Sequence, residues 1–187
     1  EGIPPMAITT KKEEAAMNDH QKREVIQAYL ASISFMDAQA GRVLDALDRL
    51  GLTSKTLVVF HSDHGYHMGE RNMWQKQSLF EESIRVPLIV AGPGVTAKGG
   101  VAKSPVELLD VYPTMADLAG FKAQTPKYLD GKSLRQALRN PAAKVKNAAF
   151  SQVNRAGGIP GMSIRTENFH FISWNYGKDG EQLYDVQ

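Results

Sequence analysis

The longest hydrophobic pattern in the chain lies between residues 19 and 50, where apolar side chains recur at steps of three and four residues. That spacing places them on one side of a helix, so the sequence predicts one long amphipathic helix. Asn18 or Asp19 can cap its first turn, and Gly51 can adopt the left-handed conformation that ends it. The apolar positions are Val25, Ile26, Tyr29, Leu30, Ile33, Met36, Ala40, Val43, Leu44, Leu47 and Leu50.

Two short apolar runs, at residues 56–62 and 86–91, are typical of buried β-strands because branched and aromatic side chains dominate them. The turn residues Gly92-Pro93-Gly94 end the second run. The stretch between the runs is polar and contains glycine. We therefore expect residues 63–78 to form a loop, followed by one helical turn at residues 78–83.

Shorter elements are expected in the second half of the chain. The letters SPVE at residues 104–107 have the pattern of a helix start with Pro at the first helical position. Pro113 predicts that this helical stretch is divided into two pieces, the second at residues 113–118. A short helix is expected at residues 133–139. Four short runs separated by turn residues then predict an antiparallel meander, at residues 148–153, 162–165, 169–174 and 181–186.

The order of these elements predicts an α/β protein with a second, smaller part. We place an α/β region at residues 1–124 and a small antiparallel α+β subdomain at residues 125–187. The 187 residues, 42% of them hydrophobic, can form one sizeable core. A net charge of +2 indicates neither a nucleic acid nor a membrane surface as partner, and no apolar run approaches the roughly 18 residues of a membrane span. The absence of Cys excludes disulfides.

Basic residues are concentrated between residues 121 and 158, where Asp130 is the single acid. A solvated surface explains such a segment, and so does a basic rim that attracts an anionic polysaccharide. The basic residues are Lys122, Lys127, Lys132, Arg135, Arg139, Lys144, Lys146 and Arg155.

The candidate chemistry lies directly after the first predicted strand, in the letters HSDHGYHMGE at residues 61–70. In open α/β sheets, ligands bind beyond the ends of the strands. Asp63 and His64 can offer a carboxylate oxygen and a ring nitrogen to one divalent cation, although an ordinary turn with a hydrogen-bonded histidine explains the pair as well. Lys76, in the letters MWQK at residues 73–76, adds a cation that can contact an oxyanion.

The ordered string from Ser62 through MWQK to the letters FEESIRVPLIV at residues 80–90 closely resembles the sulfatase family of the alkaline phosphatase superfamily. It is most similar to the iduronate-2-sulfatase-like and choline-sulfatase-like members. Residues 29–44 are similar to the helix that precedes this strand in the family, and DVYPT at 110–114 is similar to a later helix start. DGKSL at 130–134 and EQLYD at 181–185 are similar to the family's C-terminal subdomain. The resemblance implies part of an alkaline-phosphatase-like mixed sheet flanked by helices, and it covers the C-terminal portion of such an enzyme.

The resemblance also implies roles for individual residues. Asp63 and His64 match the family's metal ligands, normally for Ca²⁺, although His64 could instead hydrogen-bond the sulfate ester. Lys76 matches the lysine that contacts the sulfate oxygens. His67 either lines the substrate pocket or only closes the loop. Trp74 and Tyr66 are expected to pack around the site.

The family's nucleophile is a formylglycine made from Cys or Ser in a Cys/Ser-x-Pro-x-Arg motif, which does not occur in this sequence. The resemblance therefore implies a sulfatase fragment that is inactive without a missing N-terminal part and has an incomplete Ca²⁺ site. The implied reaction is hydrolysis of a sulfate monoester on a sulfated carbohydrate, including polysaccharides, in a periplasmic or secreted enzyme. Two alternatives stay open: a phosphonate monoester or phosphodiester hydrolase of the same superfamily, and a non-catalytic piece that binds sulfated glycans.

Overall fold

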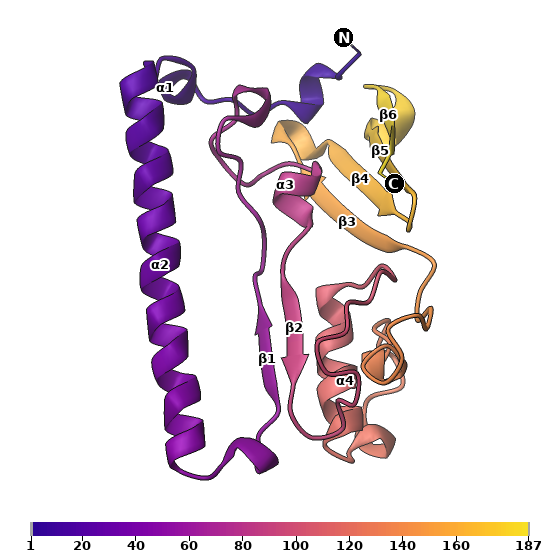
Figure 1. The fold of residues 1–187 in the computed structure, drawn as a ribbon. Helices are drawn as coiled ribbons and strands as arrows, with labels where there is room; N and C mark the ends of the chain where they lie inside the picture. The colour runs from indigo at the N-terminus through magenta and orange to yellow at the C-terminus, as the bar shows by residue number, and fades with distance from the viewer. Residues whose placement is uncertain (1, 187) are drawn as a thin grey trace.

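The computed structural model of the chain describes residues 2–186. A long helix lies along one side of the molecule, a pair of strands lies beside it, and a second sheet lies beyond them (Figure 1). The helices are α1 (Lys12–Ala15), α2 (Asp19–Arg49), α3 (Glu81–Ile84) and α4 (Val111–Leu118). The strands are β1 (Val58–His61), β2 (Leu88–Ala91), β3 (Ala149–Asn154), β4 (Pro160–Arg165), β5 (Phe169–Trp174) and β6 (Glu181–Asp185).

The predicted long helix is confirmed as α2. Its first turn is capped by Asn18, whose side-chain oxygen accepts a hydrogen bond from the backbone N–H of Gln21 at 2.9 Å. Gly51 follows its last turn with a φ of 65°, the left-handed conformation that glycine adopts without strain. None of the residues of α2 is buried. Among the described residues, no helix is long and apolar enough to cross a membrane.

The two strands after α2 form an antiparallel pair, in which Phe60 lies opposite Ile89 and His61 lies opposite Leu88. The prediction that both strands are buried is wrong, because neither β1 nor β2 has a buried residue. The side chains of Phe60 and Ile89 are 37% and 59% exposed. Within residues 2–186, no further strand joins this sheet.

The prediction that a helix starts at residues 104–107 is also wrong. The chain there is irregular, and the helical stretch begins with a 3₁₀ turn at Leu108–Asp110 that continues as α4. Glu107 and Asp110 cap that turn reciprocally. Pro113 does not divide this stretch, because it lies in the first turn of α4, where its missing N–H leaves no intrahelical bond unmade.

The four C-terminal strands form the predicted antiparallel meander in the order β3-β4-β5-β6. Side chains on β5 alternate between the two faces of this sheet, and His170, Ile172 and Trp174 are buried. Gly161 on β4 leaves room for the Trp174 ring, because a Cβ at Gly161 would lie 2.3 Å from a ring carbon. The short helix expected at residues 133–139 is reduced to a 3₁₀ turn at Leu134–Gln136.

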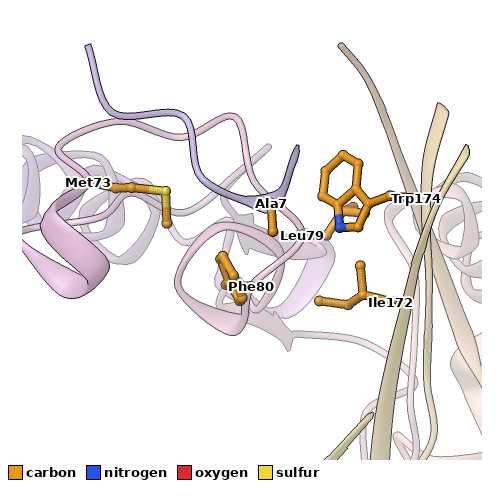
Figure 2. Close-up of a cluster of buried hydrophobic side chains, with 6 residues drawn as sticks. All are labelled: Ala7, Met73, Leu79, Phe80, Ile172 and Trp174. Atoms are coloured by element: carbon orange, nitrogen blue, oxygen red, sulfur yellow. The ribbon is translucent and has the colours of Figure 1, made fainter. Parts of the chain in front are cut away.

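The best buried apolar cluster joins three segments that are distant in the sequence (Figure 2). The N-terminal segment contributes Ala7, the loop before α3 contributes its own apolar side chains, and β5 contributes two more. This cluster attaches the loop of residues 63–78 to the C-terminal sheet. The expected division of the chain at residue 125 stays a prediction. The cluster consists of Ala7, Met73, Leu79, Phe80, Ile172 and Trp174.

Candidate active site

Asp63 and His64 lie immediately beyond the end of β1, as the sequence predicts. The Nδ1 atom of His64 lies 2.8 Å from the carbonyl oxygen of Gly65. Because a carbonyl can only accept, Nδ1 carries the proton and Nε2 of the neutral ring keeps a free lone pair. The backbone N–H of His64 donates to Oδ1 of Asp63 at 3.1 Å, which leaves Oδ2 of the carboxylate available.

Backbone contacts hold this turn in place. The N–H of Gly65 donates to the carbonyl of Ser83 on α3 at 2.8 Å. A Cβ at Gly65 would lie 2.0 Å from the carbonyl oxygen of Glu82, so only glycine permits this close approach. The hydroxyl of Ser62 donates to the carbonyl of His64 at 2.7 Å. The side chains of Asp63 and His64 therefore project from a backbone that is fixed on both sides.

Lys76 reaches the same point from the far end of the loop. Its Nζ atom lies 2.7 Å from Nε2 of His64, so the ammonium donates to the free lone pair of the imidazole. The loop between them is closed by backbone hydrogen bonds from His67 to Gln75 at 3.0 Å and from Gly69 to Met73 at 2.9 Å. Burial of Met73 and Trp74 anchors this stretch, and Lys76 itself is exposed. His64 and Lys76, which are 12 positions apart in the sequence, thus meet at one end of the loop.

His67 lies inside the loop and is completely buried. Its Nε2 atom hydrogen-bonds the hydroxyl of Ser78 at 2.7 Å, and its ring packs edge-on against Phe80 with centroids 6.1 Å apart. Burial lowers the pKa of the His67 imidazole below the ordinary 6.5, and this effect outweighs the opposing influence of Glu82 and Glu70. The sequence leaves two roles open for His67, lining the substrate pocket or closing the loop. Its buried position favours closing the loop.

The two buried histidines predict how stability depends on pH. Burial also lowers the pKa of His170 below 6.5. The unfolded chain therefore binds protons before the folded chain does, and the free energy of unfolding should fall as the pH drops below about 6.5. We expect urea midpoints to decrease between about pH 7.5 and 5.5, and to decrease less steeply in the double variant His67→Gln/His170→Gln. An unchanged slope in that variant would show that other groups carry the dependence.

The donors at Asp63 and His64 fit part of a divalent-cation site. Oδ2 of Asp63 and Nε2 of His64 lie 3.6 Å apart. Two ligands at Ca²⁺ distances, set at about a right angle around one ion, would be separated by roughly 3.3–3.7 Å. Within residues 2–186, no group of three or more His, Cys, Asp or Glu side chains is placed to hold a metal. These two residues could therefore hold Ca²⁺ only together with further ligands.

Asp63, His64 and Lys76 all line an open groove of about 1190 Å³ between the loop, β2 and the C-terminal sheet. Arg85 and Lys103 line the same groove, and neither has an ion-pair partner in the described part of the chain. The basic segment at residues 121–158 is not one free rim, because several of its cations are engaged internally. Those are Lys122 and Arg135 with Asp117, Lys144 with Glu167, and Lys146 with Glu107 and Asp110.

Two polar networks beside the groove were not predicted from the sequence. The carboxylate of Asp110 is completely buried and lies 2.7 Å from Nζ of Lys146. Glu81 on α3 accepts a hydrogen bond from Nε of Arg165 on β4 at 2.9 Å, and so ties the site loop to the C-terminal sheet. The partners in these networks are tens of residues apart, so no local pattern pairs them. The DVYPT motif at residues 110–114 indicates only that Asp110 lies at a helix start, and it gives no sign of the contact with Lys146.

Comparison with protein families shows the family of the chain. A family model described as Sulfatase matches residues 5–121, and a model described as N-sulphoglucosamine sulphohydrolase, C-terminal, matches residues 69–187. The chain belongs to the sulfatase family. The motif residues Asp63, His64 and Lys76 lie within the first match, and the groove is formed by parts of both.

Comparison with individual proteins agrees with this family assignment. It is 35% identical to the choline-sulfatase of Rhizobium meliloti over 91% of this chain and 33% of that protein. A protein solved in complex with its substrate, D-glucosamine-2-N,6-O-disulfate, is 29% identical with a TM-score of 0.76 over 84% of this chain and 33% of its own. A phosphonate monoester hydrolase from Silicibacter pomeroyi is 27% identical with a TM-score of 0.70 over 80% and 32%. The chain thus spans about a third of the length of these relatives.

Proposed function

We propose that this chain contributes two metal ligands and a sulfate contact to the hydrolysis of a sulfate monoester. Asp63 and His64 hold Ca²⁺ in this proposal, and Lys76 contacts the sulfate oxygens. The supporting observation is that a carboxylate oxygen, an imidazole lone pair and an ammonium converge at one end of a groove in a chain of the sulfatase family. The nucleophile, a formylglycine in this family, and the remaining metal ligands come from a sulfatase segment other than residues 1–187.

Each residue has a defined task in that reaction. When bound, the metal supplies positive charge that stabilises the oxygens of the sulfate group. Gly65 orients His64 by accepting its Nδ1–H, which keeps Nε2 directed to the groove. The Lys76 ammonium has three donors on a flexible stem and can move from His64 to a sulfate oxygen. Because the alcohol leaves as charge shifts on the sulfate, a donor preorganised at this point favours the transition state.

A sulfated carbohydrate is the substrate class that we infer. Arg85 and Lys103 line the same groove as Asp63, His64 and Lys76, and neither has an ion-pair partner among residues 2–186. Such cations suit a substrate that carries further anionic groups besides the ester that is cleaved. The structural relative that was solved with a disulfated glucosamine supports the same class.

A phosphonate monoester or phosphodiester hydrolase is the second candidate, and the structural likeness to the Silicibacter enzyme supports it. The experiment that separates them needs an active enzyme in which residues 1–187 are joined to a segment with the nucleophile and the other ligands. We call this the complete enzyme. We expect a higher kcat/KM for a sulfate monoester than for the matching phosphonate monoester. The reverse order would favour the second candidate, and tight binding of a sulfated sugar without turnover would indicate a non-catalytic binding protein.

The chain alone should show neither turnover nor tight metal binding. Asp63 and His64 supply two donors, whereas Ca²⁺ prefers six to eight oxygen ligands, so the missing shell must be water. We expect no sulfate release from an aryl sulfate by purified residues 1–187, and a calcium Kd in the millimolar range or weaker by calorimetry, as for weak calcium sites. Measurable turnover, or micromolar calcium affinity, would refute the proposal that the nucleophile and the remaining metal ligands come from outside residues 1–187.

A further inference from the structure

Three polar side chains of the site loop and α3 are buried and hydrogen-bonded to one another. His67, Ser78 and Ser83 are 0%, 2% and 4% exposed, although serine is a residue that mostly lies at the surface. Nε2 of His67 lies 2.7 Å from Oγ of Ser78, and the Ser78 hydroxyl donates to Oγ of Ser83 at 2.8 Å. We call these three residues the polar cluster. It joins the two limbs of the site loop to α3.

The direction of these hydrogen bonds follows from the protons that are available. Burial lowers the pKa of His67 below 6.5, so its ring is neutral at pH 7 and carries one proton. The Ser78 hydroxyl uses its own proton toward Ser83 and also accepts the backbone N–H of Phe80 at 3.2 Å. The contact with His67 is therefore one in which Nε2–H of the imidazole donates to Ser78.

Backbone hydrogen bonds connect the polar cluster to both residues that meet in the groove. The carbonyl of Ser83 accepts the N–H of Gly65 at 2.8 Å, and the carbonyl of Gly65 accepts Nδ1–H of His64 at 2.8 Å. On the other limb, the N–H of Ser78 donates to the carbonyl of Lys76 at 2.9 Å. A shift of one serine relative to the other would therefore change the 2.7 Å separation between Nζ of Lys76 and Nε2 of His64.

A polar cluster is better suited to this task than an apolar one. A hydrogen bond fixes both the distance and the direction between its atoms, whereas apolar contact is non-directional. Buried networks whose members are paired also favour one arrangement over its alternatives. The side chain of Lys76 is exposed and has little packing of its own, so its position depends on the backbone that carries it.

We propose that His67 is a positioning residue that acts through the two serines of the polar cluster. It fixes the distance between His64 and Lys76 at the value that their roles toward a metal and a sulfate require. His67 is completely buried and does not line the groove, so it acts on these residues without touching the substrate. The inference rests on the proposed function, because that function assigns the roles of His64 and Lys76.

Two substitutions of His67 in the complete enzyme separate its hydrogen bond from its volume. His67→Leu fills a similar space without a donor for Ser78, and kcat should fall roughly 10- to 100-fold, as for the loss of other groups that orient a metal ligand. KM should change less than kcat, because the groove keeps its cations while the reacting geometry is lost. His67→Gln has an N–H donor at the same depth along its side chain and should keep kcat within a few-fold of the parent.

A matched pair of serine variants tests the same connection from its other end. Ser78→Ala and Ser163→Ala each remove one buried hydroxyl, because both serines are 2% exposed. The hydroxyl of Ser163 on β4 has no hydrogen-bond partner within residues 2–186. We expect Ser78→Ala to lower kcat as His67→Leu does, and Ser163→Ala to retain the kcat of the parent.

Amide hydrogen exchange of the same variants is a readout that needs neither metal nor turnover. The N–H of Gly65 should exchange faster in His67→Leu and Ser78→Ala, because its acceptor on α3 is no longer held by the polar cluster. The amides of β5 should keep the protection that they have in the parent, because no member of the polar cluster lies on that strand.

The outcomes are distinct. Faster exchange of β5 as well, or failure of both variants to fold, would show a general loss of stability and overturn the proposal. Equal kcat values for His67→Leu and His67→Gln would also overturn it, because the hydrogen bond would then have no effect. If the parent prefers a phosphonate ester and the variants still show the expected pattern, the proposed function is contradicted and the positioning role of His67 stands.

Discussion

Replacing Lys76 by Ala should reduce kcat of the complete enzyme roughly 30- to 1,000-fold. The loss of one preorganised cation at a developing charge removes about 2–4 kcal/mol of transition-state stabilisation. The effect should appear in kcat more than in KM, because negative charge on the sulfate group shifts as the S–O bond breaks. Lys76→Arg should restore little, since a planar guanidinium directs its donors differently from an ammonium. Steady-state kinetics measure both variants.

Two controls separate this role from a structural one. Lys98 is an exposed lysine that does not line the groove, so Lys98→Ala should retain the activity of the parent. Lys76 is itself exposed, and its removal should leave the melting temperature nearly unchanged. Activity of Lys76→Ala within a few-fold of the parent would show that the residue is a bystander. A collapse of the melting temperature would show that it holds the loop together.

Replacing Asp110 by Ala should lower the free energy of unfolding by about 3–5 kcal/mol, the typical penalty for removing one partner of a buried ion pair. The carboxylate accepts hydrogen bonds from the backbone N–H groups of Glu107 at 2.8 Å and Lys132 at 2.7 Å, in addition to its contact with Lys146. Burial opposes the charge on Lys146, but Asp110 and Glu107 outweigh it and raise the pKa of that ammonium. Without Asp110, the two N–H groups lose their acceptor, and the buried ammonium of Lys146 keeps only its contact with Glu107.

Urea unfolding of the purified chain measures this loss, with Asp130→Ala as the matched control. Asp130 is exposed and should change stability by no more than about 0.5 kcal/mol. The double variant Asp110→Ala/Lys146→Met should lose less stability than the sum of the losses in the two single variants, because each single change already breaks the contact between Asp110 and Lys146. Equal effects of Asp110→Ala and Asp130→Ala would show that the buried pair does not stabilise the fold.

The sequence predicts those parts of the structure that local chemistry determines. Asn18, Gly51 and the apolar spacing between them are sufficient to define α2, and turn residues separate four short strands into a meander. The meeting of Asp63, His64 and Lys76 follows from family resemblance, and the structure places all three together. Their roles toward a metal and a sulfate stay predictions.

The errors concern features that depend on distant or absent partners. Apolar runs at residues 56–62 and 86–91 are typical of buried strands, yet Phe60 and Ile89 are 37% and 59% exposed, and within residues 2–186 no further strand joins their sheet. The pattern at residues 104–107 predicts a helix start. Instead, the side chain of Glu107 accepts a hydrogen bond from the backbone of Phe150, and its carboxylate contacts Lys146. Such long-range pairings override local propensity, and no spacing in the sequence signals them.

Sulfate release by the complete enzyme carrying Asp63→Ala, measured with calcium binding to the same protein, tests the central claim most directly. If Asp63 and His64 hold the metal that activates the sulfate ester, removal of the carboxylate abolishes turnover and tight calcium binding together. Asp63 is largely exposed at the groove, so the variant should keep the melting temperature of the parent. An enzyme with Asp63→Ala that binds calcium as tightly as the parent and still releases sulfate would contradict the account.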